Sequence, residues 1–293
     1  MELSPVPRFG AHAPHWVSMI LRTVRRKPLG AIAAAIVLVI GLLALFAPLV
    51  ATYPVGHQDL ATRFADPSRS HLFGADNLGR DIFTRIVFGA RLSLSIAFSA
   101  ALINLVVSTL IGVSSAYIGG TFDTIIQRFV DVWIALPSLL FLIFVVSILG
   151  SGVTILIILI GLLGAAHSSR VIRSAVIPIR GRPYIEAAKA TGATDARIVA
   201  RHVLPNVFPI LIVISSINIG GFIAAEAALS FLGFGVPPPE PSWGRMLNAS
   251  RDYLFEPWLA FWPGLFITMT VFGFQITGDA LRDILDPRMR QAR

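Results

Sequence analysis

The residues whose types and spacing suggest a function lie in a short polar segment between two long apolar runs. Pro183 suits the first position of a helix, and Glu186 follows in the first turn, where a negative charge interacts favourably with the helix dipole. Gly192 is placed to end this helix. Ala187 and Ala188 are small enough to let one side of the helix enter a groove on another protein. The segment therefore predicts a docking helix, and the function that it suggests is mechanical and not catalytic.

A second short helix is expected to follow directly. Thr194 or Asp195 can cap its first turn, and we expect it to run to Val203 before Pro205 leads into the next apolar stretch. The alternative is a polar connecting loop without a partner. The small residues and the glycine hinge favour the docking interpretation, because ordinary linkers are less compact.

Residues for catalysis or metal binding are not recognisable elsewhere in the sequence. The chain has no cysteine, which excludes disulfides and thiolate metal sites. Its six histidines show no ligand spacing except the weak pair His12 and His15, and no nucleophile stands beside a base. We therefore expect no enzymatic activity, no metal site and no cofactor in this chain.

The composition predicts a membrane protein. Hydrophobic residues make up 55% of the 293 and charged residues 14%, which is too apolar for an ordinary soluble domain. A helix needs about 20 apolar residues to cross the hydrocarbon core. Stretches free of Asp, Glu, Lys and Arg predict an all-α protein with six such spans: Leu29–Val50, Leu92–Ile118, two spans between Asp131 and Arg170, Val203–Ala225 and Pro257–Gly278.

The third charge-free stretch must fold back on itself. It comprises residues 132–169, and one helix of that length would extend about 57 Å against a hydrocarbon core of roughly 30 Å. Gly150-Ser151-Gly152 lies where a break is needed, and glycine tolerates a tight turn. We expect spans three and four to form a hairpin around these three residues.

The distribution of Lys and Arg predicts the orientation. With the N-terminus inside, 17 of the 24 basic residues fall in cytoplasmic segments and 7 outside, and cytoplasmic loops do retain an excess of them. Both termini and the Glu186 segment would then face the cytoplasm. Basic residues beside anionic lipid also account for the net charge of +8 without a nucleic acid. The apolar run after residue 27 is too long for a typical signal peptide, so we expect it to stay as an anchor.

These assignments divide the chain into four parts. They are a basic cytoplasmic segment (1–27), the first span with an external loop (28–91), a core of the remaining spans with a cytoplasmic loop at 171–204 (92–280), and a cytoplasmic tail (281–293).

Two external segments carry patterns of their own. In Ala51–Arg91, apolar residues at helical spacing after Asp81 predict a short interfacial helix. Asp81 and Arg85 are expected to form an i,i+4 pair on it. The alternative is a solvated connector. In Ser230–Gly244, prolines and glycines forbid a continuous helix, while aromatic residues such as Trp243 suit the bilayer interface. This second segment lines an outer mouth or is an aromatic-anchored surface loop.

The docking segment resembles the "EAA" loop of ATP-binding-cassette (ABC) importer permeases. That pattern is Glu-Ala-Ala, three residues, Gly, and then Leu-Pro at the twelfth and thirteenth positions after the Gly. His202 stands where the general pattern has isoleucine, and Arg-His-Val-Leu-Pro is the form of the dipeptide and oligopeptide branch. The matching residues here are Glu186, Ala187, Ala188, Gly192, Leu204 and Pro205.

Other stretches resemble the same branch, so the resemblance covers nearly everything after Lys27. The Leu-Gly-Arg-Asp stretch is similar to the C-type permease of such systems. The stretches concerned are His71-Leu72-Phe73-Gly74, Asp76–Asp81, Leu229–Gly235, Asp279–Asp283 and Leu285-Asp286-Pro287.

The resemblance implies a type I ABC importer permease fold with a cytoplasmic coupling helix, in the inner membrane of a bacterium. This subunit would form half of a pathway for short peptides. Its partners would be a second homologous permease, an external substrate-binding protein and two cytoplasmic ABC ATPase domains that carry ATP and Mg. Tyr184 and the six EAA-loop residues would couple it to those ATPases. Nickel, glutathione or another small solute is the alternative cargo.

A secondary transporter, an ion channel or a membrane scaffold is the alternative class of function. A secondary transporter is disfavoured because the sequence shows no internal repeat, and a channel because no filter-like motif is legible.

Polar residues are rare within the spans, which makes them candidates for the pathway. Glu226 is the strongest, because an ionisable group at that depth normally faces the protein interior or water. It could contact the amino group of a peptide, cap a helix end or pair with an external arginine. Asn104 and Asn218 could also line the pathway, although hydrogen bonding between helices is the alternative for both.

Overall fold

The computed structural model describes residues 27–285. Within these residues the chain is helical and forms no β-strand, apart from one isolated bridge between Ala75 and Asp81. The expectations for residues 1–26 and 286–293, including the His12 and His15 pair, lie outside the described residues.

Within the described chain, five helices are long and apolar enough to cross a membrane. They are α2 (Pro28–Leu45), α4 (Ile82–Ile118), α7 (Val153–Arg180), α10 (Leu204–Phe231) and α12 (Trp258–Leu285). A sixth crossing results if α5 (Gly120–Ala135) and α6 (Ser138–Leu149), which meet at a bend of 85°, form one broken span. The predicted all-α membrane protein with six spans agrees with this arrangement. The shorter elements are α3 (Ala47–Val50), the 3-10 turn η1 (Leu60–Thr62), α8 (Pro183–Ala190), α9 (Asp195–Ile198), the π-helical η2 (Val199–Val203) and α11 (Trp243–Ser250).

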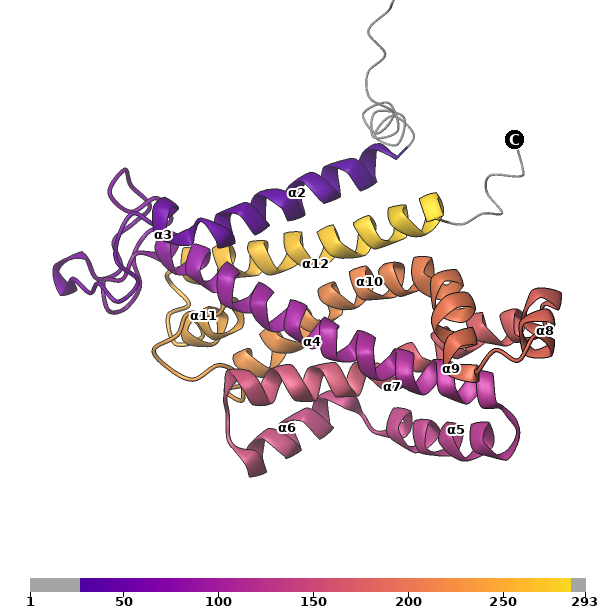
Figure 1. Ribbon diagram of the computed structural model, residues 1–293. Coiled ribbons are helices and arrows are strands. Elements are labelled where there is room, and N and C mark those ends of the chain that lie inside the picture. Colours follow the sequence, from indigo (N-terminus) through magenta and orange to yellow (C-terminus); the bar gives the residue numbers. More distant parts are fainter. Residues whose placement is uncertain (1–26, 286–293) are drawn as a thin grey trace, which may run out of the picture.

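The long helices lie side by side and give the bundle two different ends (Figure 1). Residues 51–81 and α11 lie at one end, which we call the loop end. The helices α8 and α9 lie at the other, which we call the α8 end. The start of α2 and the end of α12 meet, because Lys27 Nζ lies 2.5 Å from Asp283 Oδ2.

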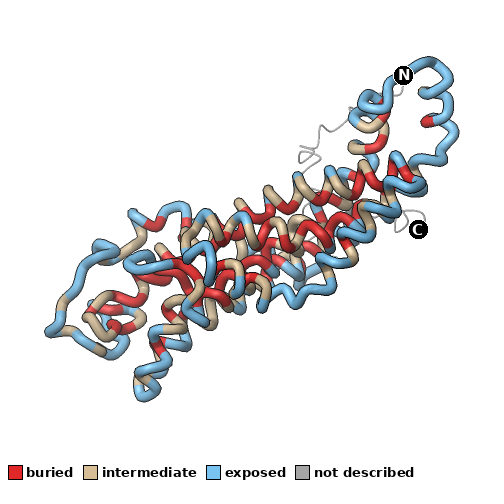
Figure 2. Tube along the Cα trace, turned by 90° about the horizontal axis from the view of Figure 1, so that it is seen from below, coloured by how far each residue is buried: buried red, intermediate tan, exposed pale blue. Residues whose placement is uncertain are grey.

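The most extensive helix–helix contact in the described chain joins α4 and α7. A Cβ atom on Gly161 would lie only 2.7 Å from the Ala100 carbonyl oxygen, and one on Gly112 only 2.6 Å from that of Ser169. Small residues at such crossings let helix backbones approach closely, which is a common way of packing helices in membranes. Buried residues accordingly run along the middle of the bundle, with exposed residues around them (Figure 2).

The predicted hairpin around Gly150 is present, but its first arm differs from the prediction. Helix α6 ends at Leu149, and α7 begins at Val153. The arm starts as early as Gly120 and is interrupted at Leu136-Pro137, because proline disfavours helical geometry at the residue before it. Helix α6 has 12 residues, about 18 Å, and therefore crosses a membrane only together with α5.

At the loop end, the predicted interfacial helix and the second span are one continuous helix, α4. The Asp81 carboxylate caps this helix by accepting a hydrogen bond from the Thr84 N–H at 2.8 Å, and it also contacts His71 Nδ1 at 3.0 Å. The predicted Asp81–Arg85 pair was therefore wrong. Arg85 Nε lies 3.7 Å from Asp76 Oδ2 instead, because capping directs the Asp81 carboxylate to the first turn of the helix.

Trp243 also departs from the sequence-based expectation. The pattern places it at the bilayer interface, but its side chain is fully buried at the start of α11. The indole Nε1 donates a hydrogen bond to the Ile86 carbonyl of α4 at 3.0 Å. Trp243 therefore joins α11 to α4 as a core residue. The segment between α10 and α11 is irregular, as its prolines and glycines predict.

Candidate functional site

The first helix of the docking segment is α8, and its ends form as predicted. Pro183 is the first residue of α8, where the N–H that proline lacks would have no partner within the helix. Glu186 lies in the same first turn. At the other end Gly192 has a φ of +81°, which glycine adopts readily. The Gly192 N–H donates to the Lys189 carbonyl and the Ala193 N–H to the Ala188 carbonyl. This pair of bonds is a Schellman turn, which stops the helix sharply.

One face of α8 is held against the bundle by Ile185. Its side chain is fully buried in an apolar cluster that lies at the α8 end of the bundle. The cluster combines the last turns of α4 and α7 with α8, α9, η2 and the start of α10, and its buried members are Val113, Ala116, Tyr117, Ile172, Val176, Ile185, Ile198, Val203, Val207 and Leu211. We call it the anchor cluster. It fixes the position of α8 relative to the spans.

Polar contacts reinforce the anchor cluster. The Tyr117 hydroxyl donates to Asp195 Oδ1 at 2.7 Å, which ties the end of α4 to the first turn of α9. The Lys189 ammonium lies 5.3 Å from the centre of the Tyr117 ring, within the range of a cation–π contact.

The opposite face of α8 is exposed. Tyr184, Glu186 and Ala187 face solvent, and α8 projects at the extreme end of the bundle (Figure 1). Lys189 is also exposed, but it lies one turn after Ile185 and contacts the Tyr117 ring. Ala188 is half-buried and packs against the anchor cluster. The two alanines therefore lie on different faces, and only Ala187 belongs to the exposed, slender side that the sequence predicts.

The second predicted helix is continuous with the next span. Thr194 caps α9, accepting from the Arg197 N–H, and α9 passes through η2 into α10 without a break. Leu204 packs partly buried against the anchor cluster, and Pro205 is exposed in the first turn of α10, where proline is tolerated. The second helix of the docking segment and α10 thus form one helical unit, and the turn at Gly192 separates α8 from it.

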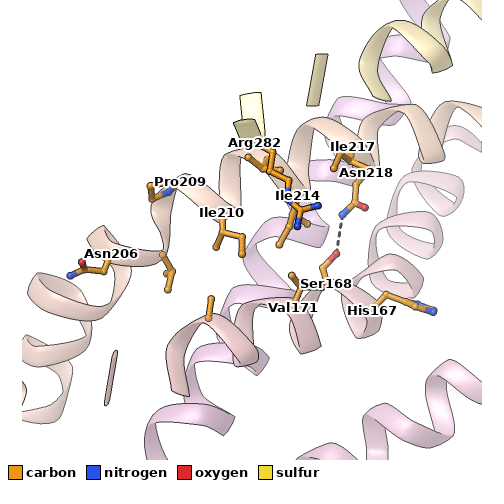
Figure 3. Close-up of a pocket in the computed structure, with 13 residues that line it drawn as sticks. His167, Ser168, Val171, Asn206, Pro209, Ile210, Ile214, Ile217, Asn218 and Arg282 are labelled. Atoms are coloured by element: carbon orange, nitrogen blue, oxygen red, sulfur yellow. Dashed lines mark hydrogen bonds between the residues drawn. The ribbon is translucent and has the colours of Figure 1, made fainter. Parts of the chain in front are cut away.

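A cavity of about 740 Å³ opens between α7, α10 and α12, in the half of the bundle that is nearer the α8 end. Asn218 lies at one side of it, donating to Ser168 Oγ at 2.9 Å and to Asn104 Oδ1 at 3.1 Å (Figure 3). Asn104 in turn donates to the Gly161 carbonyl at 3.4 Å. Asn218 therefore lines the cavity, whereas Asn104 is buried behind it and joins α4, α7 and α10.

Glu226 does not line this cavity. Its carboxyl group is fully buried nearer the loop end and accepts hydrogen bonds from Ser93 of α4 at 2.9 Å and Ser230 of α10 at 2.7 Å. The group faces the protein interior, as its depth in the span predicts, and its partners are hydroxyl groups. A contact with cargo stays a prediction.

Several residues of this region escape prediction from the sequence. Ile185 and Tyr117 anchor the docking helix, yet each is a single side chain without a motif. Arg282 lines the cavity from α12, and only its membership of the family-like stretch 279–283 distinguishes it. Within residues 27–285, no group of three or more His, Asp or Glu side chains could hold a metal ion.

Comparison with protein families decides the class of the protein. The model described as "Binding-protein-dependent transport system inner membrane component" matches residues 108–291, which include the whole docking segment and the cavity. The chain belongs to this family. A second model, the N-terminal transmembrane domain of oligopeptide transport permease C, matches residues 16–67 of the permease.

Curated relatives cover nearly all of the permease. The dipeptide transport system permease protein DppC of Alkalihalophilus pseudofirmus is 39% identical, with 92% of this chain and 89% of the relative aligned. The oligopeptide transport system permease protein OppC of Bacillus subtilis is 36% identical over 94% and 90%. The glutathione transport system permease protein GsiD of Escherichia coli O6:K15:H31 is 38% identical over 92% and 89%. The chain is thus a permease subunit of an ABC importer and a multi-pass membrane protein.

The fold has a solved counterpart. The inward-facing MetNI methionine ABC transporter, in its CY5 native crystal form, aligns with a TM-score of 0.58 and 20% identity, over 70% of this chain and 98% of that one. The predicted fold of a type I ABC importer permease is confirmed.

Proposed function

We propose that this permease forms half of the pathway through which an ATP-driven importer takes up short peptides. The relatives named for dipeptide and oligopeptide transport support this cargo. The shared chemistry is a short chain with peptide bonds and free charged ends. Glutathione, nickel or another small solute remains the alternative within the same family.

Coupling to ATP hydrolysis is proposed to occur through α8. The observation that carries this proposal is the packing of an exposed helix against a span: Ile185 is fully buried in the anchor cluster, which includes Val207 and Leu211 of α10. A push on the exposed face of α8 would therefore move α10, which lines the cavity. ATP-driven closure of the partner subunits would bias the permease between two openings, as in other two-state transporters.

The same proposal assigns the partners and the orientation. The α8 end would face the cytoplasm, in agreement with the excess of Lys and Arg in the segments assigned there. Two ABC ATPase domains with ATP and Mg would dock at that end, and an external binding protein would deliver solute at the loop end. A second, homologous permease would complete the pathway in the inner membrane of a bacterium.

The proposal is tested with the complete importer reconstituted in lipid vesicles. Gly192→Pro imposes a φ near −65° where +81° is required, and it removes an N–H that donates to Lys189. Glu186→Arg reverses a charge on the exposed face of α8. We expect both variants to insert and to assemble, and to lose the stimulation of ATP hydrolysis by solute and binding protein.

Uptake assays on the same vesicles identify the cargo. We expect accumulation of labelled di- and oligopeptides by the unmodified importer, with glutathione and nickel measured in parallel. Unchanged stimulation in both variants would refute the coupling role of α8, and uptake of nickel without peptide would refute the proposed cargo.

A further inference from the structure

The cavity between α7, α10 and α12 has the size and lining of a ligand site. Its volume of about 740 Å³ falls within the roughly 300–1,000 Å³ that is usual for small-molecule sites. Apolar side chains make up most of its wall, and they include Val171, Val213, Ile214 and Ile217. A few polar groups converge on it from three different helices, which is the usual composition of a site that orients a small molecule.

The only charged side chain among the described lining residues is Arg282. It extends from the last turn of α12 toward Ile214, on the side of the cavity where the Asn218–Ser168 pair lies (Figure 3). No carboxylate belongs to the described part of the lining. The neighbouring Asp283 is already paired with Lys27. The cavity therefore favours an anionic group, and it offers a peptide's amino end no negative charge.

Asn218 adds a hydrogen-bond acceptor. Both N–H bonds of its amide are used, since the nitrogen donates to Asn104 and to Ser168. In the described part of the chain no donor occupies its Oδ1. An amide oxygen and an arginine that line the same cavity suit a molecule that presents a carboxylate together with a nearby N–H group. The free C-terminus of a peptide presents both, because the last peptide N–H lies close to the terminal carboxylate.

We propose that this cavity holds the C-terminal carboxylate of a short peptide during its passage. The Arg282 guanidinium binds the carboxylate, the Asn218 Oδ1 accepts a backbone N–H, and the apolar wall contacts the side chains. An arginine matches a carboxylate with two parallel hydrogen bonds. The assignment rests on the proposed function and deepens it, because it names the chemical feature of the cargo that the permease recognises.

The cavity also lies where coupling would control it. Helix α10 supplies one wall and is continuous with the segment that follows α8, whereas Arg282 comes from α12. A displacement of α10 relative to α12 would therefore separate the apolar wall from the arginine. Peptide affinity would change with the nucleotide state, which is what release on one side of a membrane requires.

The test measures binding to the complete importer without nucleotide and without its binding protein, in nanodiscs of zwitterionic lipid. The probes are a fluorescent apolar tripeptide with a free C-terminus and the same tripeptide as its C-terminal amide. We expect the acid to bind about tenfold more tightly than the amide, because a charge-assisted hydrogen bond is lost with the amide. Arg282→Gln should remove this preference, and Arg282→Lys should keep part of it because lysine retains the charge without the fork.

Arg128→Gln is the matched control. Arg128 lies on α5 with 81% of its side chain exposed, and it is not a lining residue of the cavity. We expect this variant to prefer the acid as strongly as the unmodified protein does. A loss of preference in the control would show that general charge, and not the cavity, attracts the peptide, which would overturn the proposal.

Three further results would overturn the inference. The first is equal binding of acid and amide by the unmodified importer, and the second is a full preference in Arg282→Gln. The third, measured in nanodiscs to which an anionic phospholipid has been added, is photo-crosslinking of that lipid in the cavity that depends on Arg282 and excludes the peptide. In each case peptide uptake by the unmodified importer would leave the proposed function intact, whereas a failure of that uptake would refute the function itself.

Discussion

Ile185→Ala offers a quantitative test of how α8 is held. The side chain is fully buried in the anchor cluster, and the substitution removes three carbon atoms. At about 0.8 kcal/mol per buried methylene this amounts to about 2.4 kcal/mol. The residual cavity raises the loss to about 3 kcal/mol, within the range of about 2–5 kcal/mol for such substitutions. The docked position of α8 should therefore weaken by a factor on the order of 100.

The assay compares ATP hydrolysis by the reconstituted importer with and without binding protein and peptide. We expect Ile185→Ala to keep the basal rate, since no nucleotide contact is proposed for this residue, and to lose most of the stimulation. Ile177→Ala is the matched control, because Ile177 lies on α7 near the α8 end of the bundle and has 48% of its surface exposed. Full stimulation in Ile185→Ala, or an equal loss in Ile177→Ala, would refute the anchoring argument.

Two further substitutions separate coupling from stability. Tyr117→Phe removes the hydrogen bond to Asp195, and we expect a loss of about 1 kcal/mol and a smaller decrease in stimulated ATP hydrolysis than for Ile185→Ala; a decrease as large as that of Ile185→Ala would contradict the ranking. Trp243→Phe removes the indole N–H that donates to the Ile86 carbonyl and shrinks a fully buried side chain at the loop end, and we expect a loss of about 1–3 kcal/mol, seen as a lower Tm in detergent, with coupling retained. An unchanged Tm would show that this bond does not stabilise the bundle.

Features set by local chemistry could be predicted from the sequence. The start of α8 at Pro183 and its end at Gly192 follow from the backbone preferences of proline and glycine. The hairpin at Gly150 follows from the length of the charge-free stretch compared with the thickness of a bilayer. The family pattern could be recognised because its motif residues are close together in the sequence. The matching family model confirmed the family, and the solved MetNI structure confirmed the fold.

Features set by tertiary contacts were missed. Trp243 has the character of an interface aromatic, and only the packing of α11 against α4 shows that it is buried. Asp81 and Arg85 have the spacing of an ion pair, but Asp76 approaches Arg85 through a turn that spacing does not reveal. The cavity beside Arg282 is formed by three helices from distant parts of the chain. No local pattern encodes such a site.

The proposed coupling requires that the exposed face of α8 contacts an ATPase subunit. The most direct measurement replaces Ala187 with the photo-crosslinking amino acid p-benzoyl-phenylalanine in the complete importer, with the same replacement at Leu72 of the loop end as the control. We predict a covalent product between position 187 and the ATPase, and none between position 72 and the ATPase. The absence of an ATPase product at position 187 in every nucleotide state would show that α8 does not dock on the ATPase.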